Sequence, residues 1–207
     1  HRVDRRQRQM CIRDSCWAFA SVGLVEGYQS KIVGGYTALS EKHVLDCSGA
    51  GSCRSGYHTR AMDWIKRNNK LASSRSYPYR AVKGSCQGNR HSNAMRIRVT
   101  SVYTARGSSN MASALNRGPV IFFLYNFHGV AVEGYKSGVL SSEHNGLRAA
   151  NHVVVGVGYT SSQWQMRNSW GSGWGQGGYF SKSRSDRQVA SNVVYMAGSR
   201  AGEEIEE

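Results

Sequence analysis

The chain has 207 residues, of which 40% are apolar, so it can bury a core large enough for one domain or two small lobes. No apolar run approaches the roughly 18 to 20 residues that a membrane-spanning helix needs, and we expect a soluble protein. Lys and Arg outnumber Asp and Glu by 27 to 13, and the net charge of +14 favours acidic partners. Because the basic residues are scattered among Ser and Gly, we expect a solvated basic surface rather than a dedicated nucleic-acid groove.

The first half of the chain has the patterns of helices. Residues 16–33 (CWAFASVGLVEGYQSKIV) are apolar or small nearly all round, which predicts a buried helix. Ser40 followed by EKHVLDC predicts a capped second helix, and residues 58–68 (HTRAMDWIKRN) predict a third.

After about residue 106 the sequence has the patterns of strands. Four runs are rich in β-branched or aromatic residues and bounded by Gly and Ser, namely 119–125, 152–159, 163–169 and 177–183. A helical half followed by a strand-rich half predicts an α+β protein of two lobes, with an active-site cleft between them.

Cys16 has the context of a catalytic nucleophile. A thiol attacks an acyl carbon well when a helix N-terminus or a neighbouring imidazolium lowers its pKa. Cys16 opens the first predicted helix, and His152 and Asn168 follow 136 and 152 residues later. Such spacings fit a nucleophile, a base and a third group that orients the base.

Four motifs in this order, SCWAFA, LSEKHVLDCS, NHVVVGVGY and RNSWGSGWGQGGY, resemble the papain family of cysteine proteases, cathepsin L type, from Ser15 to about Ser183. The resemblance implies a papain-like two-lobe fold, with a helical left lobe and an antiparallel β-barrel-like right lobe. It implies a cysteine endopeptidase that works through a Cys16–His152 thiolate–imidazolium pair and an acyl-enzyme intermediate. Asn168 would fix the imidazole, with Trp170 and Trp17 as supporting residues.

The resemblance also implies a set of substrate-binding positions and a set of partners. The positions are Ser55, Gly56, Tyr57, His58, Phe123, Asn151 and Val153. The expected partners are peptide and protein substrates, an inhibitory propeptide and cystatin-type inhibitors. We expect a monomer in a lysosomal, vacuolar or secreted location, with no cofactor, no metal, no membrane contact and no specific nucleic acid.

The remaining cysteines and histidines also have expected roles. The resemblance pairs Cys47 with Cys86 in a disulfide. It predicts that Cys53 forms none, because its family partner would stand at position 13, which is Arg13. The other histidines have no second ligand at metal spacing, so we expect surface or loop positions for His43, His91, His128 and His144.

The N-terminal segment does not follow the family pattern. Residues 5–15 (RRQRQMCIRDS) match the translation of a transposase adapter used in sequencing libraries, so our hypothesis is that 1–15 are not native. The expected organisation is then this segment, a helical lobe over 16–106 with the nucleophile, a β-rich lobe over 107–200 with His152 and Asn168, and an acidic tail over 201–207.

Two alternatives to a competent protease stay open at this stage. Met10 stands where the family has the Gln that donates to the oxyanion, which would suit a catalytically impaired papain-fold binding protein. The high positive charge would suit a protein that binds polysaccharide or nucleic acid.

Overall fold

The structure is a computed structural model that describes residues 15–88, 95–96, 99–140 and 150–198. The described chain forms two compact units, one containing the residues up to Val102 together with 196–198 and the other containing 103–195. The expectations for residues 1–14 and for the acidic tail fall outside the described residues. No helix in the described ranges is both long enough and apolar enough to cross a membrane.

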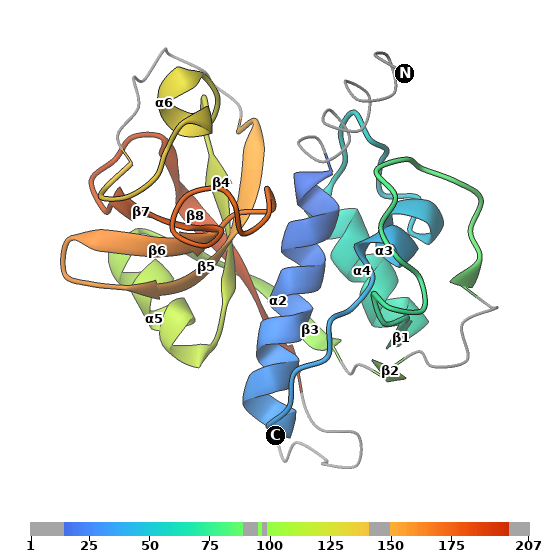
Figure 1. The fold of residues 1–207 in the computed structure, drawn as a ribbon. Helices are drawn as coiled ribbons and strands as arrows, with labels where there is room; N and C mark the ends of the chain where they lie inside the picture. The colour runs from blue at the N-terminus through green and yellow to red at the C-terminus, as the bar shows by residue number, and fades with distance from the viewer. Residues whose placement is uncertain (1–14, 89–94, 97–98, 141–149, 199–207) are drawn as a thin grey trace, which may run out of the picture. The chain divides into compact units, whose positions relative to one another are not determined.

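The first unit contains the three predicted helices, which the structure confirms. They are α2 (Cys16–Val33), α3 (Glu41–Cys47) and α4 (His58–Asn68), followed by the short antiparallel pair β1 (Lys70–Leu71) and β2 (Met95–Arg96) (Figure 1). Ser40 caps α3 as expected, because its Oγ accepts the backbone N–H of His43 at 2.9 Å.

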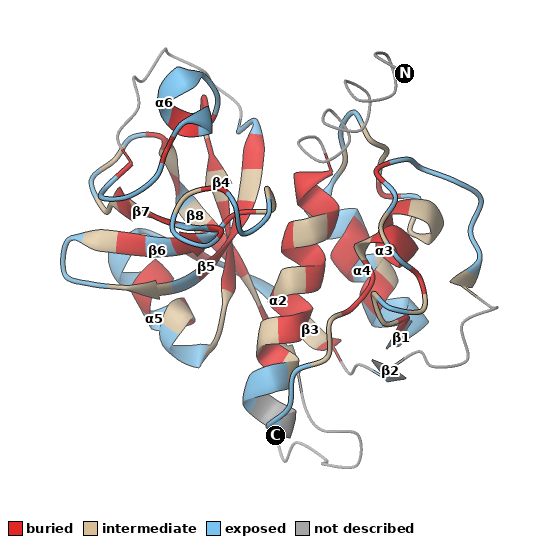
Figure 2. Ribbon diagram, viewed as in Figure 1, coloured by how far each residue is buried: buried red, intermediate tan, exposed pale blue. Residues whose placement is uncertain are grey.

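The core of the first unit forms around α2. Side chains such as Trp17, Val22 and Leu24 are buried, the less buried positions 19, 23 and 27 lie one turn apart on a single face, and exposed residues begin only at position 30 (Figure 2). Helix α4 is amphipathic instead, with Met62 and Ile65 fully buried and the opposite face exposed. Burial of such apolar side chains is worth about 1.5 to 3 kcal/mol each.

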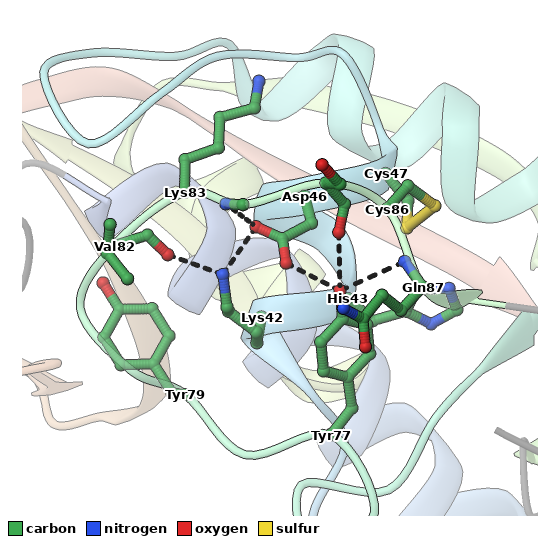
Figure 3. A network of polar contacts seen from close by, with 12 residues as sticks. Lys42, His43, Asp46, Cys47, Tyr77, Tyr79, Val82, Lys83, Cys86 and Gln87 are labelled. Carbon is green, nitrogen blue, oxygen red and sulfur yellow. Dashed lines mark hydrogen bonds and ion pairs between the residues drawn. A yellow bond between two sulfur atoms is a disulfide. The ribbon is translucent and has the colours of Figure 1, made fainter. Parts of the chain in front are cut away.

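A polar network attaches the segment after β1 to α3 (Figure 3). Lys42 Nζ donates to Asp46 Oδ1 at 2.7 Å and to the carbonyl oxygen of Val82 at 2.6 Å. Tyr77 donates its hydroxyl to Asp46 Oδ2 at 2.6 Å. Burial, reinforced by the hydrogen bond to Asp46, raises the pKa of Tyr77 to about 12. The network therefore attaches residues 77–84, which form neither a helix nor a strand, to α3.

The second unit is built on a six-stranded sheet in the order β3-β8-β4-β5-β6-β7. The structure confirms the four predicted strands as β4 (Val120–Leu124), β5 (His152–Tyr159), β6 (Gln163–Arg167) and β7 (Tyr179–Ser183). Elements that the sequence patterns did not predict are β3 (Val99–Arg106), α5 (Ser108–Arg117), α6 (Val130–Glu133) and β8 (Val189–Gly198). Strands β3 and β8 each continue into residues of the first unit.

Over the described residues, the expected barrel-like lobe is an antiparallel sheet that is not closed. In the part of the chain that the structure describes, β3 and β7 are its two edges and do not pair with each other. The outer edge of β7 is used by another segment, since Val139 bridges Ser181 and Leu140 donates its N–H to the carbonyl oxygen of Ser181 at 2.8 Å.

The core of the second unit is rich in aromatic rings. Phe127 has ring centroids of Trp174 and Phe180 at 6.3 and 5.3 Å, and Phe122 has that of Trp164 at 5.2 Å. These rings belong to one buried cluster against which Trp170 packs. Aromatic pairs at such distances add about 0.5 to 1.5 kcal/mol beyond the area that they bury.

Candidate active site

Cys16 is the first residue of α2 and is buried, with 7% of its surface exposed. Among the described cysteines it is the one that forms no disulfide. The carbonyl oxygen of Ser15 accepts the N–H groups of Ala18 and Phe19 at 2.8 and 3.2 Å, which begins the helix at this point. The thiol therefore lies at the positive end of an 18-residue helix, where the dipole favours a thiolate.

A tyrosine hydroxyl holds the residue before Cys16. Ser15 Oγ does not cap the helix and instead hydrogen-bonds the hydroxyl of Tyr79 at 2.7 Å. The ring of Tyr79 also meets Phe19 edge-on, with centroids 4.8 Å apart. Burial raises the pKa of Tyr79. Two contacts from one side chain thus fix the first turn of α2.

The chain passes directly over the ring of Trp17. Trp17 Nε1 donates to the carbonyl oxygen of Ser52 at 3.2 Å. A Cβ placed on Gly56 would lie 2.3 Å from the Trp17 ring, so only glycine allows this approach. Gly56 also bridges Gly51, and Tyr57 donates its N–H to the carbonyl oxygen of Ala50 at 2.9 Å.

Residues 55–58 present different groups to solvent. The side chain of Ser55, which stands where the family has glycine, is exposed and meets no obstacle. Tyr57 is 62% exposed, with the guanidinium carbon of Arg60 5.0 Å from its ring centroid. His58 begins α4, and burial lowers its pKa. Residues 55–58 belong to the same unit as Cys16 and Trp17.

His152 and Asn168 form a buried hydrogen-bonded pair in the second unit. His152 begins β5 and is 3% exposed, and Asn168, just after β6, is 6% exposed. His152 Nε2 lies 2.8 Å from Asn168 Oδ1. The pairing of β5 with β6, with Val155 opposite Arg167, brings the two strand ends together.

The surroundings of Asn168 fix the imidazole tautomer. Asn168 Oδ1 accepts the backbone N–H of Ser169 at 2.8 Å, and a backbone N–H can donate only to the oxygen of an amide. The atom facing His152 is therefore an oxygen, so Nε2 carries a proton and donates it. In the neutral ring Nδ1 is then the basic nitrogen, so protonation changes at Nδ1.

Two aromatic rings hold the imidazole in place. The ring of Phe127 stacks on His152 at 4.8 Å with an interplanar angle of 3°, and the Trp170 ring centroid lies at 5.4 Å. The two rings therefore restrict the orientation of the imidazole. Asn168 Nδ2 is buried with no hydrogen-bond partner in the described chain, a loss of about 1 to 3 kcal/mol. Asn168 therefore places its Oδ1 next to His152 at a cost to the stability of the folded state.

Three predicted substrate-binding residues also lie in the second unit. Phe123 and Val153 are cross-strand partners on β4 and β5, and both are partly buried, so they form one apolar pair. Asn151 is exposed, and its Oδ1 accepts the N–H of Phe127 at 2.9 Å. Asn151 therefore supports the turn that places Phe127 on His152.

The structure gathers the predicted site residues in two groups. Cys16, Trp17 and residues 55–58 lie in the first unit, whereas the other predicted catalytic, supporting and substrate-binding residues lie in the second. Sequence patterns missed Phe127 and the backbone N–H of Ser169. No sequence signal marks Phe127, since its placement depends on a turn at Asn126, which has a positive φ of 50°.

The disulfides bear out one prediction and correct another. Cys47 and Cys86 are bonded, as the resemblance implied, with a sequence separation of 39. Cys53 was expected to form no disulfide, but it is disulfide-bonded, to a partner outside the described residues. The prediction fixed the partner by one alignment position, whereas a disulfide depends on the distance between the two cysteines.

One histidine also differs from expectation. His43 is not a surface or loop residue, because it lies in α3, is 4% exposed, and its Nδ1 accepts the N–H of Ala72 at 3.1 Å. His128 is exposed as expected, and His91 and His144 lie outside the described residues. In the ranges that the structure describes, no cluster of His, Cys, Asp and Glu could hold a metal ion.

Comparison with known proteins identifies the family. Residues 3–197 match the family described as papain family cysteine protease. Macrodontain-1 of Ananas macrodontes is 39% identical over 165 residues, which cover 79% of this chain and 76% of that protein. Ananain of Ananas comosus is 36% identical over 178 residues, or 82% of this chain, and the match spans 50% of ananain.

A solved structure has the same fold. The Carica candamarcensis cysteine protease CMS1MS2, described in complex with E-64, matches with a TM-score of 0.80 at 27% identity, over 91% of this chain and 90% of that one. The chain therefore belongs to the papain family of cysteine proteases and has the α+β fold of that family. Its class is that of the papain-like cysteine endopeptidases.

Proposed function

We propose that Cys16 is the nucleophile of this endopeptidase, that His152 is its general base and acid, and that Asn168 orients the imidazole. The observation that carries the proposal is the His152 Nε2–Asn168 Oδ1 bond of 2.8 Å, with Ser169 N–H fixing the amide orientation. Because Nε2 is engaged, Nδ1 is the nitrogen that takes the Cys16 proton. Asn168 cannot take up charge, so it orients the imidazole and relays no proton.

The reaction then has two stages. The thiolate of Cys16 attacks the scissile carbonyl carbon, and His152 Nδ1–H gives its proton to the leaving amine as the peptide bond breaks. His152 next removes a proton from water, which attacks the acyl-enzyme and releases the acid and the thiol. The aromatic contacts of His152 hold the imidazole in one orientation through both stages.

The substrate and partners follow from the same assignment. We propose that the backbone of residues 55–56 pairs with extended peptide substrates, and that Tyr57, His58, Phe123 and Val153 line an apolar pocket with Asn151 beside it. The apolar pair Phe123–Val153 supports such a pocket. An inhibitory propeptide and cystatin-type inhibitors would use the same site. We propose a monomer in a lysosomal, vacuolar or secreted location, with residues 16–106 and 107–200 as the two lobes.

The test is hydrolysis of a dipeptidyl-coumarin substrate by purified variants. Cys16→Ala and His152→Ala should abolish turnover, because each removes a reacting group. Asn168→Ala should lower kcat by a smaller factor, since thiolate and base remain. His128→Ala, at an exposed histidine, is the matched control and should leave turnover unchanged. Equal and small losses from all three site variants would refute the assignment.

A papain-fold binding protein is the second candidate. It is favoured by Met10 in place of the family's oxyanion Gln, a residue outside the described ones. Removal of one oxyanion donor typically lowers the rate by about 10²- to 10³-fold. Met10→Gln should therefore raise turnover by that order. A folded Met10→Gln protein with no turnover would establish the binding role instead.

A further inference from the structure

Basic residues are denser over residues 66–98 than in the chain as a whole. No Asp or Glu occurs between Asp63 and Glu133. Within that interval, residues 66–98 carry nine basic side chains, which are Lys66, Arg67, Lys70, Arg75, Arg80, Lys83, Arg90, Arg96 and Arg98. The positive charge of the protein is therefore a local feature and not only a property of the whole surface.

The fold brings four of these side chains to one place in the first unit. Lys66 and Arg67 lie in the last turn of α4. Lys70 follows three residues after Arg67, so the Cα atoms of Arg67 and Lys70 are within about 11 Å of each other. Lys70 is the direct cross-strand partner of Arg96 in the β1–β2 pair. All four are exposed. We refer to Lys66, Arg67, Lys70 and Arg96 as the α4–β2 basic patch.

The patch is not explained by the stability of the fold alone. Cations in the last turn of a helix interact favourably with its dipole, which accounts for Lys66 and Arg67. Like charges directly opposite each other on antiparallel strands are destabilising, and Lys70 faces Arg96. In the described chain none of the four side chains has an ion pair with a carboxylate. An anionic ligand would turn this repulsion into attraction.

The chemistry of the patch favours one class of polyanion. Proteins that bind single-stranded nucleic acid interleave cations with exposed aromatic rings on which bases stack. The aromatic side chain nearest in sequence, Trp64, is partly buried and packs edge-on against His43 at 5.2 Å. In the described chain, no cation–π contact joins any of the four patch side chains to an aromatic ring, so the patch offers charge and hydrogen-bond donors without a ring beside it. We propose that the α4–β2 basic patch binds a sulfated polysaccharide, independently of the peptidase activity.

The experiment measures binding of size-defined heparin oligosaccharides and elution from immobilised heparin. Lys70→Gln/Arg96→Gln should weaken heparin binding by about tenfold. It should also lower the slope of log Kd against log salt by roughly two, one for each lost ion contact. The matched control is Lys136→Gln/Arg187→Gln, which removes the same charge from exposed positions of the second unit and should change Kd less than about twofold. Lys70→Arg should keep the affinity.

A second pair of variants, thermal melting and a second ligand also test the proposal. Lys66→Gln/Arg67→Gln repeats the test at the helix end if the strand variant unfolds, and thermal melting checks the fold of each. Equal losses in the patch and control variants would show that only net charge matters and would overturn the proposal. Tighter binding of single-stranded DNA than of heparin of equal charge would overturn the choice of partner. Peptide hydrolysis should stay unchanged in every variant, so failure here leaves the proposed catalytic residues untouched.

Discussion

Gly56 is the residue whose size the structure constrains most directly near Cys16. Its backbone lies against the ring of Trp17, the neighbour of the proposed nucleophile Cys16, and a Cβ would come within 2.3 Å of that ring. The same residue forms a bridge with Gly51. Because the ring is held from another side by Ser52, it has little room to move away. The packing around Gly56 therefore couples a predicted substrate-binding stretch to the start of α2.

We predict that Gly56→Ala destabilises the protein by about 1 to 3 kcal/mol, the usual effect of overpacking a filled site. Chemical denaturation measures the change. Gly35→Ala is the control, because a Cβ there meets nothing within 4 Å, and it should be neutral or stabilising by up to about 1 kcal/mol. If the two variants have the same stability, Trp17 can yield and the packing argument fails.

At the residue scale, sequence motifs predicted the candidate site residues but not the surroundings of individual side chains in the fold. Cys16, His152 and Asn168 were predicted as the catalytic residues because each lies in a motif that resembles the family. Patterns could not reveal that Lys182 is fully buried, where its Nζ donates to Asp186 and Gln188 at 2.6 and 2.8 Å. That burial depends on residues brought together by the fold of β7 and β8, and no local pattern carries this information.

At the scale of elements, α3 and the segment after β1 are joined by Asp46. Its carboxylate accepts from Lys42, from the Tyr77 hydroxyl and from the N–H of Gly84 at 2.8 Å (Figure 3). Ionisation of Tyr77 would break one of these bonds and place two negative charges together. Burial of Tyr77, together with its hydrogen bond to Asp46 and the charge of that carboxylate, raises the pKa of Tyr77 to about 12.

We predict that Tyr77 makes stability depend on pH above 10. The pKa of Tyr77 is higher in the folded than in the unfolded chain. Its contribution to the free energy of unfolding is therefore complete below pH 10 and is lost as the pH rises through about 12. This contribution is about 2 to 3 kcal/mol. Urea denaturation of Cys16→Ala protein, with and without Tyr77→Phe, measures it. Tyr77→Phe should flatten the decline between pH 10 and 12, whereas Tyr103→Phe, at an exposed tyrosine, should not.

A decline of the same steepness in the Tyr77→Phe protein would assign the pH dependence to other groups. At neutral pH the same variant should lose about 1.5 to 3 kcal/mol, because a hydrogen bond to a charged acceptor is removed.

Elements with strong local signals were predictable and the others were not. Helix α3 was marked by its Ser40 cap, and β5 by a run of β-branched residues. Helix α5 begins after Gly107, without a side-chain cap, and β3 is mostly polar and partly exposed. Both depend on tertiary contacts, since β3 is stabilised by pairing with β8 from the far end of the chain.

At the scale of the whole molecule, covalent cross-links are distributed unevenly. All five cysteines precede residue 103, so the second unit contains none and depends on its aromatic core. The Cys47–Cys86 disulfide closes a loop with a sequence separation of 39. In the chain-entropy model, such a loop stabilises the folded state by about 4 kcal/mol. The two units should therefore respond differently to loss of this bond.

We predict that Cys47→Ala/Cys86→Ala loosens the first unit selectively. Amides of α2, α3 and α4 that exchange through unfolding of their unit should exchange up to about a thousandfold faster, as about 4 kcal/mol implies, because the unfolded chain gains the entropy that the bond removed. Amides of β4, β5 and β6 should keep their rates, since their hydrogen bonds and aromatic neighbours lie in the second unit. Hydrogen exchange followed by mass spectrometry resolves the two sets, and Cys16→Ala, which removes a cysteine but no disulfide, is the control. If the strands lose protection as much as the helices, the units open in a single cooperative step, and the disulfide stabilises the whole protein rather than the helical part.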